Sequence, residues 1–160
     1  MKIGILTISD KGSRGEREDK SGEEIRSALR AVHAEVAAYE IVPDEADVIA
    51  ATLRRWADVL NLDVVLTTGG TGLSPRDVTP EATRAVLHKE APGIAEAMRL
   101  ESLKKTPRAM LSRAAAGVRG QTLIVNLPGS PKAVREMMEV ISPVLLHAVE
   151  IIQGRPTDHG

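Results

Sequence analysis

The sequence has 160 residues, the length of one domain, and a chain of this size buries roughly 70% of its unfolded surface on folding. Its 21 lysines and arginines are matched by 22 aspartates and glutamates, giving a net charge of −1 and no reason to expect binding to nucleic acid or to a membrane. The chain has no phenylalanine and too few other aromatic residues for a base-stacking platform. The absence of cysteine excludes disulfides, thiolate nucleophiles and cysteine-ligated zinc.

The apolar run at the N-terminus is short. It covers residues 3–8 and is followed at once by Asp10 and Lys11, so it is too short for a signal peptide. No later run approaches the ~20 apolar residues that a membrane-spanning helix needs. We therefore expect a cytoplasmic protein.

Four short runs rich in apolar and β-branched residues predict strands. They cover residues 2–8, 34–42, 63–68 and 122–126. The charged segment 9–20 contains glycine and is predicted to be a loop.

Helices are predicted between the strands from their start signals and apolar spacing. Ser21 and Glu24 form a capping box for the first helix. Asp44 stands at the N-cap position of the second, whose apolar positions include Trp56 and extend to Leu60. The third has Thr79 as its cap and Pro80 as its first residue.

The later helices are placed by proline. Residues 92–116 predict two helices, the second beginning at Thr106-Pro107 and closed by Gly117. A C-terminal helix follows residue 131, and Ser142-Pro143 is expected to break or kink it.

Strands that alternate with helices predict an α/β fold: a three-layer α/β/α arrangement of a mainly parallel sheet with helices on both faces. Three strands end in loops, near Ser9, Thr68 and Asn126, that lead into helices. Ligands of such sheets bind beyond the carboxyl ends of the strands. We therefore expect the three loops to meet at one crevice.

The segment from Thr68 to Gly72 has three glycines among its last four residues. Such a turn lets backbone N–H groups face an anion, but it can equally be a tight corner that closes a strand. It matches neither the P-loop nor the dinucleotide-binding pattern. The residues alone leave both interpretations open.

Two aspartates lie at comparable junctions between a strand and a helix. Asp77 could hold Mg²⁺ against bound phosphates, with Arg76 neutralising their charge, or it could complement a helix dipole. Asp44 could face the same crevice or serve only as an N-cap.

The turn over residues 126–132 presents a helix N-terminus beyond a strand, a second plausible anion site with Lys132 nearby. Ser130 is interpreted as a cap or a ligand rather than a nucleophile, because no catalytic serine motif surrounds it. The histidines show no metal-ligand spacing; they are His33, His88, His147 and His159.

Three segments together resemble the molybdopterin adenylyltransferase family of the MogA/MoaB type, which is shared with a domain of gephyrin. They are Ile8-Ser9-Asp10, Thr67-Thr68-Gly69-Gly70-Thr71-Gly72 followed by Arg76-Asp77-Val78-Thr79-Pro80, and Asn126-Leu127-Pro128-Gly129-Ser130-Pro131-Lys132. The resemblance covers nearly the whole chain as a single domain and implies the α/β fold already expected.

The resemblance also implies an activity in molybdenum cofactor biosynthesis. Mg²⁺-ATP and molybdopterin yield adenylylated molybdopterin and pyrophosphate, and the product passes to a molybdate-insertion enzyme. Such proteins usually form trimers and sometimes hexamers. The alternative is a molybdopterin carrier or scaffold without adenylylation, and a third interpretation is a related nucleotide-handling domain of the competence-associated type.

In this family two aspartates matter for catalysis, and they correspond here to Asp44 and Asp77, which we expect to bind Mg²⁺ and orient the phosphates. Substrate and nucleotide binding is expected at Ser9, Asp10, Thr68, Gly69, Gly70, Thr71, Gly72, Arg76, Asn126, Pro128, Gly129, Ser130 and Lys132.

Overall fold

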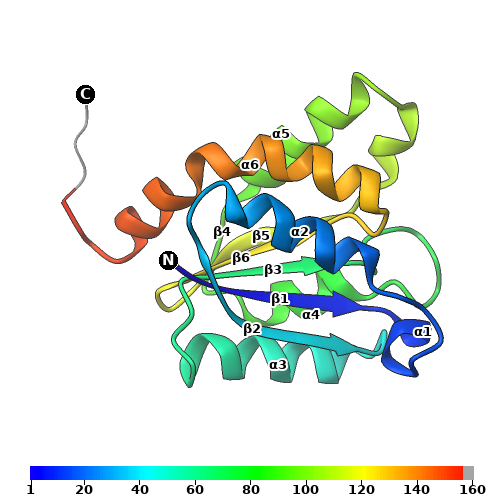
Figure 1. Ribbon diagram of the computed structural model, residues 1–160, viewed down its shortest axis with the longest axis horizontal. Coiled ribbons are helices and arrows are strands. Elements are labelled where there is room, and N and C mark those ends of the chain that lie inside the picture. Colours follow the sequence, from blue (N-terminus) through cyan, green and yellow to red (C-terminus); the bar gives the residue numbers. More distant parts are fainter. Residues whose placement is uncertain (157–160) are drawn as a thin grey trace.

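The computed structural model describes residues 1–156, and a six-stranded sheet forms its centre (Figure 1). In sheet order the strands are β2 (Glu35–Val42), β1 (Lys2–Ile8), β3 (Val64–Thr68), β6 (Thr122–Leu127), β5 (Ala116–Arg119) and β4 (Lys89–Glu90). The first four run parallel to one another, whereas β5 and β4 are antiparallel to their neighbours. The expected mainly parallel sheet is confirmed.

Helices cover both faces of the sheet (Figure 1). On one face lie α2 (Lys20–Arg30), α5 (Pro92–Leu103) and α6 (Pro131–Ile152), and on the other lie α3 (Ala46–Asp58) and α4 (Thr79–Val86). Two short elements complete the fold, α1 (Asp10–Ser13) and the 3₁₀ turn η1 (Pro107–Leu111). The three-layer α/β/α fold is confirmed, and no helix within residues 1–156 is long and apolar enough to cross a bilayer.

Each face of the sheet has its own apolar core, because successive side chains of a strand point to opposite faces. Ile3 and Ile5 of β1 belong to the core under α2, α5 and α6, whereas Leu6 belongs to the core over α3 and α4. Trp56 of α3 is 1% exposed, and a Cβ on Gly4 would lie only 2.6 Å from its ring. The small residue in β1 thus lets the indole pack against the sheet.

The starts of the first helices differ from the predicted ones. The N-cap of α2 is Asp19, whose carboxylate accepts from the Gly22 N–H at 2.9 Å, so the Ser21 and Glu24 capping box was a wrong prediction. The segment before it is not all loop, since it contains α1. In α3 the N-cap position belongs to Glu45 rather than Asp44, whose carboxylate is occupied elsewhere.

Two helix ends also differ. The helix α3 ends at Asp58, so Leu60 lies outside it and is 46% exposed. In α4 the N-cap position falls on Val78, and Thr79 is the first helical residue.

The region before β6 was predicted least well. The expected second helix of segment 92–116 is only the turn η1, and Gly117 belongs to β5 instead of closing a helix. The cause is a hairpin: Gly120 has a φ of 57° and joins β5 to β6. The C-terminal helix α6 continues through Pro143, so of the expected break or kink the break is absent.

Candidate functional site

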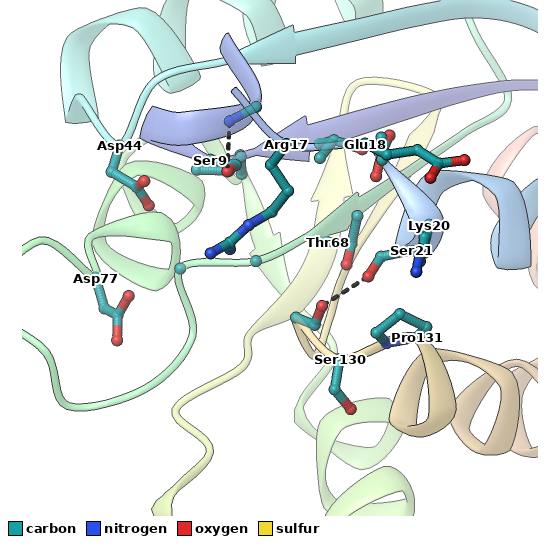
Figure 2. Close-up of a pocket in the computed structure, with 17 residues that line it drawn as sticks. Ser9, Arg17, Glu18, Lys20, Ser21, Asp44, Thr68, Asp77, Ser130 and Pro131 are labelled. Carbon is teal, nitrogen blue, oxygen red and sulfur yellow. Dashed lines mark hydrogen bonds between the residues drawn. The ribbon is translucent and has the colours of Figure 1, made fainter. Parts of the chain in front are cut away.

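The carboxyl ends of β1, β3 and β6 open onto one cavity of about 780 Å³ (Figure 2). The loops after all three strands contribute to its wall, as their positions in the sequence predicted. Its lining consists of Thr7, Ile8, Ser9, Gly12, Arg17, Glu18, Asp19, Lys20, Ser21, Asp44, Thr68, Gly69, Gly70, Asp77, Gly129, Ser130 and Pro131.

The glycine turn after β3 is packed too tightly for side chains. Gly69 and Gly70 have φ values of 98° and 69°, in the region that favours glycine. A Cβ on Gly69 would lie 2.3 Å from the carbonyl oxygen of Ile8, and one on Gly70 would lie 2.3 Å from Thr79 Oγ1. The turn therefore presents bare backbone to the cavity, while Thr79 Oγ1 donates to Gly69 O at 2.9 Å and fixes it to α4.

Asp44 and Asp10 are joined by two reciprocal hydrogen bonds. The Asp10 N–H donates to Asp44 Oδ2 at 2.9 Å, and the Asp44 N–H donates to Asp10 Oδ1 at 3.0 Å. Burial raises the pKa of the Asp44 carboxyl, and the nearby charges of Asp10 and Asp77 raise it further. This is a place where negative charge gathers and where a cation would be favourable.

Asp77 is held at the other side of the glycine turn. Its Oδ2 accepts from the Ser74 N–H at 3.0 Å, and its own N–H donates to Ser74 O at 2.9 Å. A Cβ on Gly72 would lie 2.9 Å from Asp77 Oδ2, so the third glycine of the turn leaves room for this carboxylate. Asp44 and Asp77 both line the cavity, and Figure 2 shows them on the same side of it.

Arg113 braces the loop that carries Asp77, and no local pattern in the sequence would have identified it. Its Nε donates to Gly72 O at 2.8 Å, its Nη2 donates to Asp77 O at 2.9 Å, and its backbone N–H donates to Thr71 O at 2.8 Å. Its remaining edge forms an ion pair with Glu81. One side chain thus ties both ends of the loop together.

Arg76 does not line the cavity, contrary to its expected role beside the phosphates. Its guanidinium contacts both carboxylate oxygens of Asp10, at 3.1 and 3.0 Å, and Glu45 Oε1 at 2.9 Å. The hydrogen bonds from Arg76, and one from the Asp44 N–H, lower the pKa of the Asp10 carboxyl. Arg76 and Asp10 therefore form a brace beside the cavity wall.

Two hydroxyl groups pin the turn that follows β6. Thr68 Oγ1 donates to Pro128 O at 2.6 Å, and Ser21 Oγ donates to Gly129 O at 2.6 Å. Ser130 lines the cavity and caps α6 by accepting from the Ala133 N–H at 3.2 Å.

Asn126 holds three partners through its side chain and lines a second cavity. It is fully buried, and its Nδ2 donates to Thr67 Oγ1 at 3.0 Å and to Thr83 Oγ1 at 2.9 Å. Its Oδ1 accepts from the Ala115 N–H at 3.1 Å. Of the other expected binding residues, Asp10, Thr71, Gly72 and Lys132 lie outside the lining of the first cavity.

A second cavity, of about 280 Å³, lies beyond Ser130, which lines both. Its walls come from α5, η1, the segment before β5 and the start of α6, and they combine apolar side chains such as Ala95, Met98 and Met137 with Arg99 and polar hydroxyls. Asn126 and Pro128, both expected to bind substrate, line this cavity and not the first.

Within residues 1–156 no group of three or more His, Asp or Glu side chains is placed to hold a metal ion. His159 lies outside the described residues. A metal at the first cavity would accordingly depend on two protein carboxylates together with oxygen atoms of the bound substrate, which is the coordination that Mg²⁺ commonly adopts beside phosphates.

Residues 4–147 match the family described as "Probable molybdopterin binding domain". The chain belongs to this molybdopterin-binding family. It is 46% identical over 156 residues to the molybdopterin adenylyltransferase of Helicobacter pylori strain J99, covering 96% of this chain and 89% of that protein. It is 40% identical over 155 residues to the enzyme of the same name from Escherichia coli K12, covering 93% and 80%.

The fold agrees with the same family. The molybdopterin biosynthesis enzyme MoaB from Thermus thermophilus has a crystal structure that superimposes with a TM-score of 0.91 at 59% identity, covering 97% of this chain and 98% of that chain.

Segment 17–21 forms one wall of the first cavity, although none of its residues was among the predicted site residues. Asp19 anchors that wall: its carboxylate accepts from Thr7 Oγ1 at 2.6 Å, from the Gly22 N–H at 2.9 Å and from the Tyr39 hydroxyl. The only signal in the sequence was position, because the segment lies between the first strand and the first long helix.

Proposed function

We propose that this chain is a molybdopterin adenylyltransferase of molybdenum cofactor biosynthesis. The observation that carries the proposal is the placement of Asp44 and Asp77 on one cavity with the bare Gly69-Gly70 turn. The relatives named molybdopterin adenylyltransferase match nearly the whole chain.

In this reaction an oxygen of the terminal phosphate of molybdopterin attacks the α-phosphorus of ATP. The bond from that phosphorus to the oxygen bridging to the β-phosphate breaks, and pyrophosphate leaves with the electron pair. Two polyanions must be held together, so catalysis rests on positioning and on charge neutralisation. The glycine turn supplies close backbone approach, because no side chain stands between its peptide groups and the cavity.

The two aspartates fit the oxygen-ligand preference of Mg²⁺. The raised pKa of Asp44 reflects burial and neighbouring acids, and a divalent cation between Asp44 and Asp77 would relieve that repulsion. When bound, the ion would neutralise phosphate charge and orient the α-phosphate for attack. Asp10 and Arg76 keep Asp44 in place from outside the cavity.

The two cavities suit the two substrates. The first, with its glycine turn and aspartates, fits the polyphosphate of ATP. The second is smaller, more apolar and hydroxyl-lined, which fits a flat bicyclic pterin with polar edges. Because Ser130 lines both, the reacting phosphates would meet beside it.

We also propose that the 160 residues act as one domain in a cytoplasmic homotrimer or hexamer that passes its product to a molybdate-insertion enzyme. Exposed apolar side chains on α5 and η1 favour self-association: Leu100, Met110 and Leu111 are 65%, 66% and 50% exposed.

The test is a pyrophosphate-release assay with purified protein, Mg²⁺, ATP and molybdopterin. The wild type is expected to release pyrophosphate, and Asp77→Asn is expected to abolish turnover while its circular dichroism and melting curve stay those of the wild type. Tight binding of molybdopterin without any ATP-dependent release would contradict the enzyme and favour the carrier alternative.

A further inference from the structure

Cationic side chains stand free in the first cavity. Arg17 and Lys20 line it, and neither makes a hydrogen bond or an ion pair through its side chain with any residue of the described chain. Figure 2 shows Arg17 extended into the cavity, while Glu18 points the other way. The contrast with Arg76 is clear, because that guanidinium is occupied by Asp10 and Glu45.

The charges that line the cavity explain why a free cation is needed there. The lining includes four acidic residues (Glu18, Asp19, Asp44 and Asp77) and two basic ones, Arg17 and Lys20, and Glu18 points away from the cavity. A Mg²⁺ ion would offset the two charges of Asp44 and Asp77. Asp19 is already stabilised by its three hydrogen-bond donors. Arg17 and Lys20 are therefore the lining side chains that can neutralise the negative charge of a nucleotide triphosphate.

The chemistry of the two side chains also differs in a useful way. A guanidinium offers a planar fork of N–H donors that matches phosphate oxygens, whereas an ammonium acts as a point charge. Arg17 projects on the side of Asp44 and Asp77, and Lys20 lies nearer to Ser21 and Pro131 (Figure 2). The two cations can thus contact different parts of one extended polyphosphate.

We propose that Arg17, assisted by Lys20, binds the triphosphate of ATP in this cavity and takes the role that local sequence assigned to Arg76. This assignment rests on the proposed adenylyltransferase function. It concerns a residue outside the glycine turn and the two aspartates, in a segment that the motifs did not cover.

The test measures binding as well as turnover in the full chain. Dissociation constants for Mg²⁺-ATP and for inorganic tripolyphosphate are determined by titration calorimetry for the wild type, Arg17→Ala, Arg17→Lys and Lys20→Ala. Lys11→Ala is the matched control, because Lys11 is an exposed cation of the neighbouring helix α1 that does not line the cavity. Melting curves check that each variant is folded.

Arg17→Ala is expected to weaken both ligands about tenfold, the effect of losing one charge-assisted phosphate contact. Arg17→Lys should recover most of that loss, Lys20→Ala should lose less, and Lys11→Ala should match the wild type. The difference between wild type and Arg17→Ala should shrink as salt is raised.

Unchanged affinity of Arg17→Ala for both ligands overturns the assignment, and so does a wild type that binds neither. Binding as expected without pyrophosphate release refutes the enzymatic function and leaves the Arg17 site standing. Full turnover by Arg17→Ala at the wild-type KM for ATP refutes the Arg17 site and leaves the enzymatic function standing.

Discussion

Replacing Arg113 tests whether the loop over residues 70–77 is held in place from outside the cavity. Arg113→Ala removes the donors to Gly72 O and Asp77 O, at 2.8 and 2.9 Å, and the ion pair with Glu81. The backbone bond from Arg113 N–H to Thr71 O at 2.8 Å stays. Of its three hydrogen bonds from Arg113, the loop would keep one and lose the two that fix the backbone at Gly72 and Asp77.

The size of the effect follows from these contacts. A hydrogen bond from a charged donor contributes about 1.5–3 kcal/mol. The Arg113 side chain is 31% exposed, so water replaces part of what is lost. We expect Arg113→Ala to lower the free energy of unfolding by about 2–4 kcal/mol, and much of this loss should appear as easier local opening of the loop. A misplacement of Asp77 by about 1 Å would cost on the order of a hundredfold in kcat.

The assay pairs amide hydrogen exchange of residues 70–77 with the Mg²⁺ dependence of pyrophosphate release. Arg113→Ala should exchange faster in the loop and need more Mg²⁺ for half-maximal activity. Arg113→Lys should rescue little, because an ammonium cannot reach both carbonyls as the guanidinium fork does. Glu81→Gln leaves the carbonyl contacts and should stay close to the wild type. Wild-type exchange and Mg²⁺ dependence in Arg113→Ala would refute the reasoning.

Three further outcomes are expected. Because burial raises the pKa of Asp44, ionisation of this carboxyl lowers the free energy of unfolding as the pH rises from its ordinary pKa to the raised one. Asp44→Asn should therefore melt no lower than the wild type at neutral pH without Mg²⁺, while losing turnover. A lower melting temperature of this variant would contradict the account. Asn126→Ala should cost about 3–5 kcal/mol in urea unfolding, since three partners lose their hydrogen bonds; a loss below about 1 kcal/mol would exclude that account. Gly70→Ala should lower the stability of the fold by about 1–3 kcal/mol, because residue 70 has a positive φ and the added Cβ would clash with Thr79 Oγ1. Gly93→Ala should be neutral or stabilising, because a Cβ there meets no atom within 4 Å.

The parts of the structure that the sequence predicted are those with local causes. The strands β1, β3 and β6 are continuous apolar runs, and the glycines at 69 and 70 stand where the backbone needs a positive φ. For Asp44 and Asp77 the residues alone left a cap and a site role open, and the resemblance of their segments to the family favoured the site; the structure places both on the cavity.

The parts that it missed depend on contacts between distant residues. Nothing near Arg113 in the sequence indicates that it contacts the loop some 40 residues earlier. Arg76 lies beside Asp77 in the sequence, yet the acids within its reach come from positions 10 and 45, so local reasoning assigned it to phosphate. The β5 strand was not predicted because the pairing that makes it a strand is with β4 and β6 and not within the segment itself.

The hydroxyl of Ser21 that pins Gly129 O has a consequence for how the protein folds. The two residues are 108 positions apart, and Arg135 meets Glu24 across 111 positions. Segment 17–21 can therefore contact the turn at Gly129 only after synthesis has nearly reached the last helix, α6. Loop-closure entropy is spent before such contacts form, which slows folding of parallel sheets. During synthesis the first cavity is thus among the last features of this molecule to be completed.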